Sequence, residues 1–268
     1  MRKILFALAL ALVTGSALAQ GKVEVLWLGQ AAFKITTPGG KVIVIDPWLK
    51  TNPKTPAGYK NLAALGKVDV VLVTHGHFDH VADAPELVNM HKARLYAPPG
   101  LSGTLVTLGQ VPADLAPGMN KSGIATPLGP DIKFHMARAE HSSEFRFKDP
   151  VSGQERMFPG GEPVGWIVEM ENGFKIYHMG DTGLFGDMRM IGEMYKPDLV
   201  LVPIGGNFTI NAQQAAFAVR DMIKPRFAIP MHYGTFPILA GKPEDFVKGL
   251  DGASTRAIVM NPGEEVKF

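Results

Sequence analysis

The chain has 268 residues, with 27 Lys and Arg against 25 Asp and Glu, and it contains no cysteine. The absence of cysteine excludes disulfides, iron–sulfur clusters and thiolate zinc sites, so any metal ligands must be nitrogen or oxygen atoms. The formal net charge of +2 belongs to Arg2 and Lys3, and the remainder is near neutral. It therefore lacks the basic surface of a nucleic-acid-binding protein.

The first 19 residues follow the order of a secretory signal peptide. Arg2 and Lys3 precede an apolar run of about ten residues over 4–13, too short for a membrane-spanning helix of roughly 20 residues. Ala17-Leu18-Ala19 then forms a small-residue cleavage site. We expect residues 1–19 to be a signal peptide and residues 20–268 to form a single domain. We also expect a periplasmic or secreted protein with no integral membrane segment in the mature chain.

The first half of the mature chain alternates strands and turns. Residues 23–28, 32–36 and 41–45, with a Pro-Gly-Gly turn at 38–40, predict a β-meander that ends at Asp46. Residues 51–60 are rich in Pro, Gly and Lys and predict a loop. The continuous apolar run 68–73 predicts a strand buried on both faces. A helical pattern over residues 81–91 follows it.

The second half begins with residues 97–130, which are so dense in Gly and Pro that few elements can be assigned there. Residues 148–163 form a Pro- and Gly-rich insertion and a candidate flap over a site. Residues 213–223 predict an amphipathic helix. Strands are predicted at 132–139, 166–170, 174–178, 198–203 and 226–230. Residues 166–178 repeat the pattern of the first meander, a strand, a Gly turn and a strand followed by an Asp. This repetition fits two β-rich halves that face each other, with helices outside.

The densest chemical signal is His75-x-His77-x-Asp79-His80, directly after the strand at 68–73. Alternate residues leaving a strand point to the same side, so His75 and His77 can face one ion. Asp79 and His80 lie at the turn into the helix and can face a second ion nearby. Imidazole and carboxylate ligands suit Zn, Mn, Fe or Co.

Three later residues each follow a predicted strand: His141, Asp181 and His232. In layered α/β folds the strand ends converge on one edge, where ligand sites gather. Added to the first cluster, these residues give five histidines and two carboxylates. That number suffices for two metal ions with four to five ligands each, with Asp181 able to bridge them.

The HGHFDH segment matches the H-x-H-x-D-H signature of the metallo-β-lactamase superfamily, which the chain resembles over essentially all of its mature length. More narrowly, it resembles the metal-dependent hydrolases related to the ascorbate-phosphate lactonases. The segments behind this likeness are GQAAF (29–33), IDPWL (45–49), GDTGLF (180–185), KPDLVLVPIGGNFT (196–209) and PMHYGTFP (230–237). Gln30 departs from the pattern, because this branch often has His there. The resemblance implies an α/β fold, a four-layer αββα sandwich.

The resemblance also implies a ligand set for two divalent metal ions, with Zn as the first expectation and Mn or Fe as alternatives. It places His75, His77 and His141 on one ion. It places Asp79, His80 and His232 on the other, with Asp181 as the bridge. Such a pair activates water and polarises the scissile bond. Asp79 is the candidate catalytic residue, orienting that water or taking its proton.

Four further residues are candidates with an alternative explanation for each. Asp46 either orients a ligand imidazole or caps the turn before Pro47. His178 is interpreted as a core residue or a support for the ligands. The Gly205-Gly206-Asn207 segment either offers N–H groups to an oxyanion or forms a tight turn. Tyr233 lines the pocket or belongs to the core, as do Trp48, Phe208 and Phe236.

The leading functional hypothesis is metal-dependent hydrolysis of an ester, lactone or phosphodiester bond in a small-molecule substrate. A periplasmic β-lactamase is an alternative within the hydrolases. Outside them, iron redox chemistry and metal binding without turnover stay open. The sequence names neither the substrate nor the oligomeric state.

Overall fold

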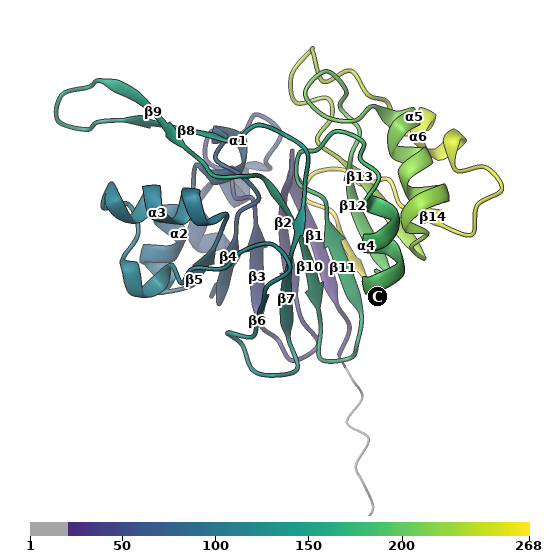
Figure 1. The fold of residues 1–268 in the computed structure, drawn as a ribbon, viewed down its shortest axis with the longest axis horizontal. Coiled ribbons are helices and arrows are strands. Elements are labelled where there is room, and N and C mark those ends of the chain that lie inside the picture. The colour runs from purple at the N-terminus through teal and green to yellow at the C-terminus, as the bar shows by residue number, and fades with distance from the viewer. Residues whose placement is uncertain (1–20) are drawn as a thin grey trace, which may run out of the picture.

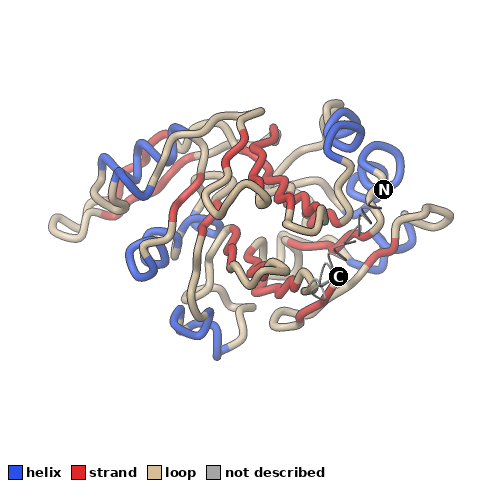
Figure 2. The backbone as a smooth tube through the Cα atoms, turned by 90° about the horizontal axis from the view of Figure 1, so that it is seen from below, coloured by secondary structure: helices blue, strands red, loops and turns tan. Residues whose placement is uncertain are grey.

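The computed structural model describes residues 21–268, and the predicted signal peptide lies outside them. Two β-sheets lie face to face in the middle of the molecule, and helices cover their outer faces (Figures 1 and 2). This arrangement confirms the predicted αββα layers. None of the helices within residues 21–268 combines the length and apolar character that a bilayer crossing requires.

The first sheet has six strands in the order β15-β1-β2-β3-β4-β5. The strands β1, β2 and β3 form the predicted antiparallel meander, and β3, β4 and β5 run parallel. The C-terminal strand β15 pairs with the outer edge of β1. The strand bounds are β1 Glu24–Gly29, β2 Ala32–Thr36, β3 Val42–Ile45, β4 Val70–Leu72, β5 Arg94–Tyr96 and β15 Glu265–Lys267.

The second sheet has seven strands in the order β14-β13-β12-β11-β10-β7-β6. The strands β6, β7, β10 and β11 are antiparallel neighbours, and β11 to β14 run parallel. The strand bounds are β6 Ile124–Ala125, β7 Lys133–Arg138, β10 Val164–Glu169, β11 Lys175–His178, β12 Leu199–Pro203, β13 Phe227–Met231 and β14 Arg256–Ala257.

Strand alternation divides the buried side chains among three apolar layers. In β4, Val70 and Leu72 point into the layer between the two sheets, whereas Val71 points to the helices on the outer side. In β12, Leu201 lies between the sheets and Val200 packs under the helices of the other side. Both strands are buried on both faces, as their continuous apolar sequences predict.

The helices differ from the sequence-based expectations in detail. The helix expected at 81–91 is α2, which begins three residues later, and a separate short helix α1 ends at Val81. Between them, Asp83 binds the loop after β3: its N–H donates to Pro47 O, and its carboxylate accepts from Leu49 N and Lys50 N. The helix expected at 213–223 changes from α to π geometry after Phe217. The helix bounds are α1 Phe78–Val81, α2 Ala84–His91, α3 Pro99–Thr107, α4 Met188–Tyr195, α5 Ala212–Phe217 and α6 Pro243–Gly249.

The expected insertion is a β-hairpin that projects from the body of the molecule (Figure 1). Its strands are β8 Glu144–Lys148 and β9 Glu155–Pro159, so the element begins before the predicted boundary. The base of the hairpin is fixed because Phe145 is buried in the layer under α2 and α3. The hairpin rises at the edge of the sheets where α1 begins.

Candidate metal centre

Seven side chains converge beyond the strand ends at this edge and form three overlapping groups of possible metal ligands. Within each group the ligand atoms lie within 4.8 Å of one another. The groups are His75, His77 and His141; His75, His80 and Asp181; and Asp79, His80 and His232. All seven candidate metal ligands identified in the sequence are therefore brought together.

The first group is built by the exit of β4. His75 Nε2 lies 2.9 Å from His77 Nδ1, and the two rings are nearly perpendicular. Gly76 between them has a steric role, because a Cβ atom there would lie 3.1 Å from the backbone of Glu144. The hairpin strand β8 thus packs directly on the His-Gly-His segment. His141 approaches from the end of β7, and its Nε2 lies 3.7 Å from Asp181 Oδ2.

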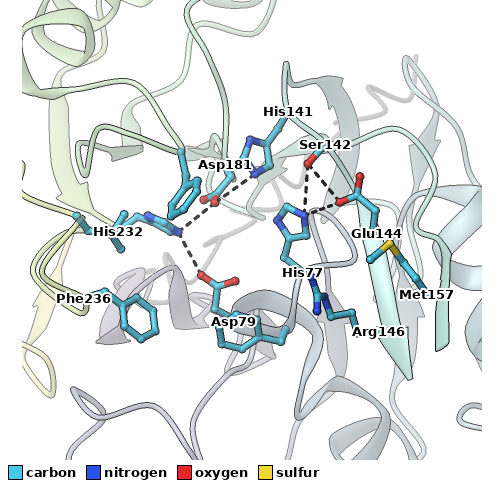
Figure 3. A pocket seen from close by; sticks show the side chains of 13 residues that line it. His77, Asp79, His141, Ser142, Glu144, Arg146, Met157, Asp181, His232 and Phe236 are labelled. Carbon is cyan, nitrogen blue, oxygen red and sulfur yellow. Dashed lines mark hydrogen bonds and ion pairs between the residues drawn. The ribbon is translucent and has the colours of Figure 1, made fainter. Parts of the chain in front are cut away.

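The group of Asp79, His80 and His232 joins α1 to the end of β13. His232 Nε2 lies 3.4 Å from Asp79 Oδ2 and 3.0 Å from Asp181 Oδ2, and Figure 3 shows Asp181 between His232 and His141. His80 Nε2 lies 3.3 Å from Asp181 Oδ1. Asp181 therefore has an oxygen near the imidazoles of this group and near His141, which belongs to the group of His75 and His77.

The unsatisfied atoms of this cluster fit a metal ion. Within residues 21–268, His80 Nε2 and Asp181 Oδ1 are buried without a hydrogen-bond partner, although they lie 3.3 Å apart. Buried polar atoms normally have hydrogen-bond partners, so two that converge in this way fit a shared role as metal ligands. The donor set is nitrogen and oxygen only, which suits Zn, Mn or Fe.

Opposite charges set the protonation of the metal-free cluster. Burial lowers the pKa of His80, but the carboxylates of Asp181, Asp46 and Asp79 raise it well above its ordinary value. Burial likewise lowers the pKa of His232, yet Asp181 and Asp79 raise it to about 9. Burial raises the pKa of Asp79, but His80 and His232 bring it down to about 2. Without metal at neutral pH, His80 and His232 therefore carry protons.

Metal binding is expected to release protons, because a ligating imidazole must be neutral. At pH 7 we expect about two protons per chain, from His80 and His232. The release should fall above pH 9, where His232 is already neutral, and metal affinity should fall as the pH is lowered. Titration calorimetry of the metal-free protein in two buffers of different ionisation enthalpy measures the release. Binding at pH 7 with no proton release would contradict this protonation scheme.

Two carboxylates contact ligand rings at the nitrogen that faces away from the cluster, one buried and one at the pocket. Asp46, at the end of β3, accepts hydrogen bonds from Thr74 N and Thr74 Oγ1, and its Oδ2 lies 2.7 Å from His80 Nδ1. The carboxylate therefore fixes the ring so that Nε2 faces the cluster. On the other side, Glu144 Oε2 of the hairpin lies 2.9 Å from His77 Nε2. The orienting role considered for Asp46 thus has a geometric basis.

The other three candidates lie away from the ligand groups. His178 Nε2 donates to Ala31 O, and its Nδ1 accepts from Gly180 N, so this ring supports the turn before Asp181. Tyr233 packs against Trp27 with ring centroids 5.6 Å apart. Asn207 is exposed in a turn with φ 55°, and its neighbour Phe208 lines the pocket instead.

Gln30 contacts two candidate ligands, which the sequence did not predict. The sequence showed only that Gln stands where this branch often has His. It adopts a left-handed conformation with φ 52° in the turn between β1 and β2. Its carbonyl accepts from Trp27 Nε1 and His232 N, each at 3.1 Å. Its Nε2 lies 2.9 Å from Asp79 Oδ2 and 2.8 Å from His232 Nε2. A strained backbone held on both sides thus places this amide beside two candidate ligands.

Replacing Gln30 by alanine is expected to weaken metal binding about tenfold, because Asp79 loses the donor that orients it. Gln213→Ala, on the exposed side of α5, is the matched control and should bind metal like the wild type. Competition with a chromogenic chelator measures both affinities. Equal metal affinity in the two variants would mean that Gln30 supports only the turn between β1 and β2 and does not orient Asp79.

A pocket of about 510 Å³ opens above the ligands. It is bordered by ligand residues, by the hairpin and by the segment after β12 and β13 (Figure 3). The residues besides the ligands are Phe78, Ser142, Glu144, Arg146, Met157, Phe208, Phe236 and Leu239. The predicted flap region thus contributes Met157, while Glu144 and Arg146 precede it.

Known proteins resemble this chain in both sequence and structure. Residues 41–233 match the family model of the beta-lactamase superfamily domain. A UPF0173 metal-dependent hydrolase of Cupriavidus necator is 61% identical over 250 residues, which cover 92% of this chain and 86% of that protein. Another, from Rubrobacter xylanophilus, is 42% identical and covers 92% of this chain and 97% of its own length.

Two solved structures have a similar fold. Igni18, a metallo hydrolase from the hyperthermophilic archaeon Ignicoccus hospitalis, is 33% identical with a TM-score of 0.79, covering 92% of this chain and 98% of that chain. The metallo-beta-lactamase fold protein YhfI of Bacillus subtilis has a TM-score of 0.66 and covers 92% of this chain and 100% of its own. Since YhfI is only 12% identical, its likeness concerns the fold alone.

Proposed function

Since the chain belongs to the metallo-β-lactamase superfamily and is a metal-dependent hydrolase, we propose that it uses two divalent metal ions to hydrolyse an ester, lactone or phosphodiester bond. The substrate is a small molecule, in keeping with a pocket of about 510 Å³. Zinc is the first candidate metal, and Mn or Fe also suits the ligands.

The position of Asp181 carries the proposal of two ions. Its Oδ2 lies 3.7 Å from His141 Nε2 and 3.0 Å from His232 Nε2, which belong to different ligand groups. Its Oδ1 lies 3.3 Å from His80 Nε2. A carboxylate in this position is suited to bridge two ions.

The chain's residues have distinct roles in this proposal. His75, His77 and His141 hold one ion, whereas Asp79, His80 and His232 hold the other. Metal ions so held lower the pKa of water and polarise the scissile carbonyl or phosphoryl oxygen. Asp79, oriented by Gln30, faces the pocket and orients the attacking water or accepts its proton.

A substrate panel tests the proposal. The metal-loaded protein should cleave at least one ester, lactone, phosphodiester or β-lactam faster than a His77→Ala variant does. His91→Ala, at the end of α2 and outside the ligand groups, should behave like the wild type. The proposal fails if no substrate in the panel is cleaved faster by the wild type than by His77→Ala.

We also propose that the protein is exported, with residues 1–19 removed and residues 20–268 forming the mature domain. The support is the order of charge, apolar run and small-residue site in the sequence. Mass spectrometry of protein recovered from the periplasm or medium should give an N-terminus at Gln20. Full-length protein retained in the cytoplasm would contradict this.

A further inference from the structure

The pocket has an apolar wall, which we define as Phe78, Met157, Phe208, Phe236 and Leu239. Three of these side chains are strongly exposed: Phe78 at 55%, Met157 at 59% and Phe208 at 57%. Exposed apolar side chains that gather in one pocket mark a binding site, because burying them removes apolar surface from water. The apolar wall is therefore available to an apolar part of a substrate.

The aromatic part of this wall is held in place from behind. The buried Trp48 stacks on Phe236 with ring centroids 5.9 Å apart, and it meets the edge of Phe78 at 5.4 Å. Its Nε1 donates to Thr51 Oγ1 at 2.7 Å, which fixes the indole. A wall fixed before binding loses little side-chain entropy when a ligand packs against it.

Apart from the proposed metal ions, the side chains that line the pocket offer little positive charge to an anionic substrate. Of the residues that line the pocket in the described chain, Arg146 alone is a lysine or arginine, and it pairs with Glu155 at 3.3 Å. Glu144 contributes a negative charge on the same side (Figure 3). Phosphoryl-transfer sites commonly hold their charged oxygens with Arg, Lys or metal-ion clamps. Among the side chains that line the pocket, no unpaired Arg or Lys adds such a clamp to the proposed metal ions.

We propose, building on the proposed hydrolase function, that the substrate is an uncharged carboxylic ester or lactone whose acyl or aromatic group packs against the apolar wall. The reaction adds water to the acyl carbon and breaks its bond to the alkoxy oxygen. The alkoxy oxygen leaves as a hydroxyl group, and the acyl part becomes a carboxylate plus a proton. Water is the sole co-reactant.

Three substrates with the same leaving group test this substrate class on the zinc-loaded protein. They are p-nitrophenyl acetate, p-nitrophenyl hexanoate and bis(p-nitrophenyl) phosphate. The longer acyl chain should raise kcat/KM by about tenfold over acetate, since apolar contacts discriminate by such factors. The hexanoate should also be preferred to the charged phosphodiester.

Substitutions in the wall separate binding from chemistry. Phe208→Ser and Met157→Ser should reduce the hexanoate-to-acetate ratio about fivefold, mainly through KM, because less apolar area is buried. Both side chains are exposed, so folding and metal content should stay unchanged. Phe217→Ser, at a position on α5 that is 43% exposed and outside the pocket, is the control that should keep the wild-type ratio.

The outcomes distinguish this inference from the proposed function. A preference for the phosphodiester, or a hexanoate-to-acetate ratio near one, would overturn the apolar ester class while leaving a hydrolase. A ratio that the wall variants do not change would overturn the role of the wall. Failure to cleave any substrate in the wider panel faster than His77→Ala would instead remove the proposed function.

Discussion

Asp181→Ala is expected to lower kcat/KM by more than about a hundredfold. A hundredfold is about the largest loss expected when a residue that only orients a metal ligand is removed. The loss should be larger because the Asp181 oxygens lie within 3.7 Å of His80, His141 and His232. His141 belongs to the ligand set of one proposed ion, and His80 and His232 belong to that of the other. Removing the carboxylate also leaves buried imidazoles without their main countercharge. Steady-state kinetics and metal content of the same preparations give the result.

Asp114→Ala is the matched control for this substitution. Asp114 is exposed and belongs to none of the ligand groups. It should keep both the wild-type rate and the metal content. If Asp181→Ala keeps wild-type kinetics and full metal content, this carboxylate does not bridge the two proposed metal ions.

The second large effect is expected for Asp46→Ala. This carboxylate is fully buried and accepts from Thr74 N and Thr74 Oγ1 at 2.7 Å, beside His80 Nδ1 at 2.7 Å. Its removal takes away the carboxylate that faces His80 Nδ1 and the buried Thr74 N–H, while Asp181 still faces His80 Nε2. We expect the free energy of unfolding of the metal-free protein to fall by about 3 kcal/mol. Metal affinity should fall by about 10- to 100-fold.

Urea unfolding with and without chelator measures the stability change, and chelator competition measures the affinity. Asp46→Asn is the informative companion, because it keeps a side-chain oxygen that can accept from Thr74 but removes the charge opposite His80. It should recover part of the lost stability and little of the affinity. If Asp46→Ala changes the free energy of unfolding by less than about 1 kcal/mol, this carboxylate does not stabilise the site as proposed.

The strands that position the site could be predicted from the sequence, because each is a short run of apolar residues that can be recognised without knowing its distant contacts. The strands β4 and β12 have continuous apolar sequences, and the structure buries both on both faces. The ligands were found from the dense H-x-H-x-D-H segment and from three later residues that each follow a strand, because strand ends meet at one edge of a layered fold. The seven side chains meet there in the structure.

The parts that the sequence did not predict depend on contacts between distant segments. Gln30 meets His232 across 202 positions, and Glu144 meets His77 across 67, so no local pattern contains either pair. The break between α1 and α2 has the same origin, because Asp83 binds the loop after β3. The narrower likeness to ascorbate-phosphate lactonases stays a prediction.

The number of metal ions per chain tests the central claim most directly. Metal analysis should be made on mature protein purified without chelator, beside a His77→Ala/Asp181→Ala double variant. The account predicts about two transition-metal ions per wild-type chain and their loss in the double variant. No bound metal in the wild type, even after reconstitution with zinc, manganese or iron, would contradict it.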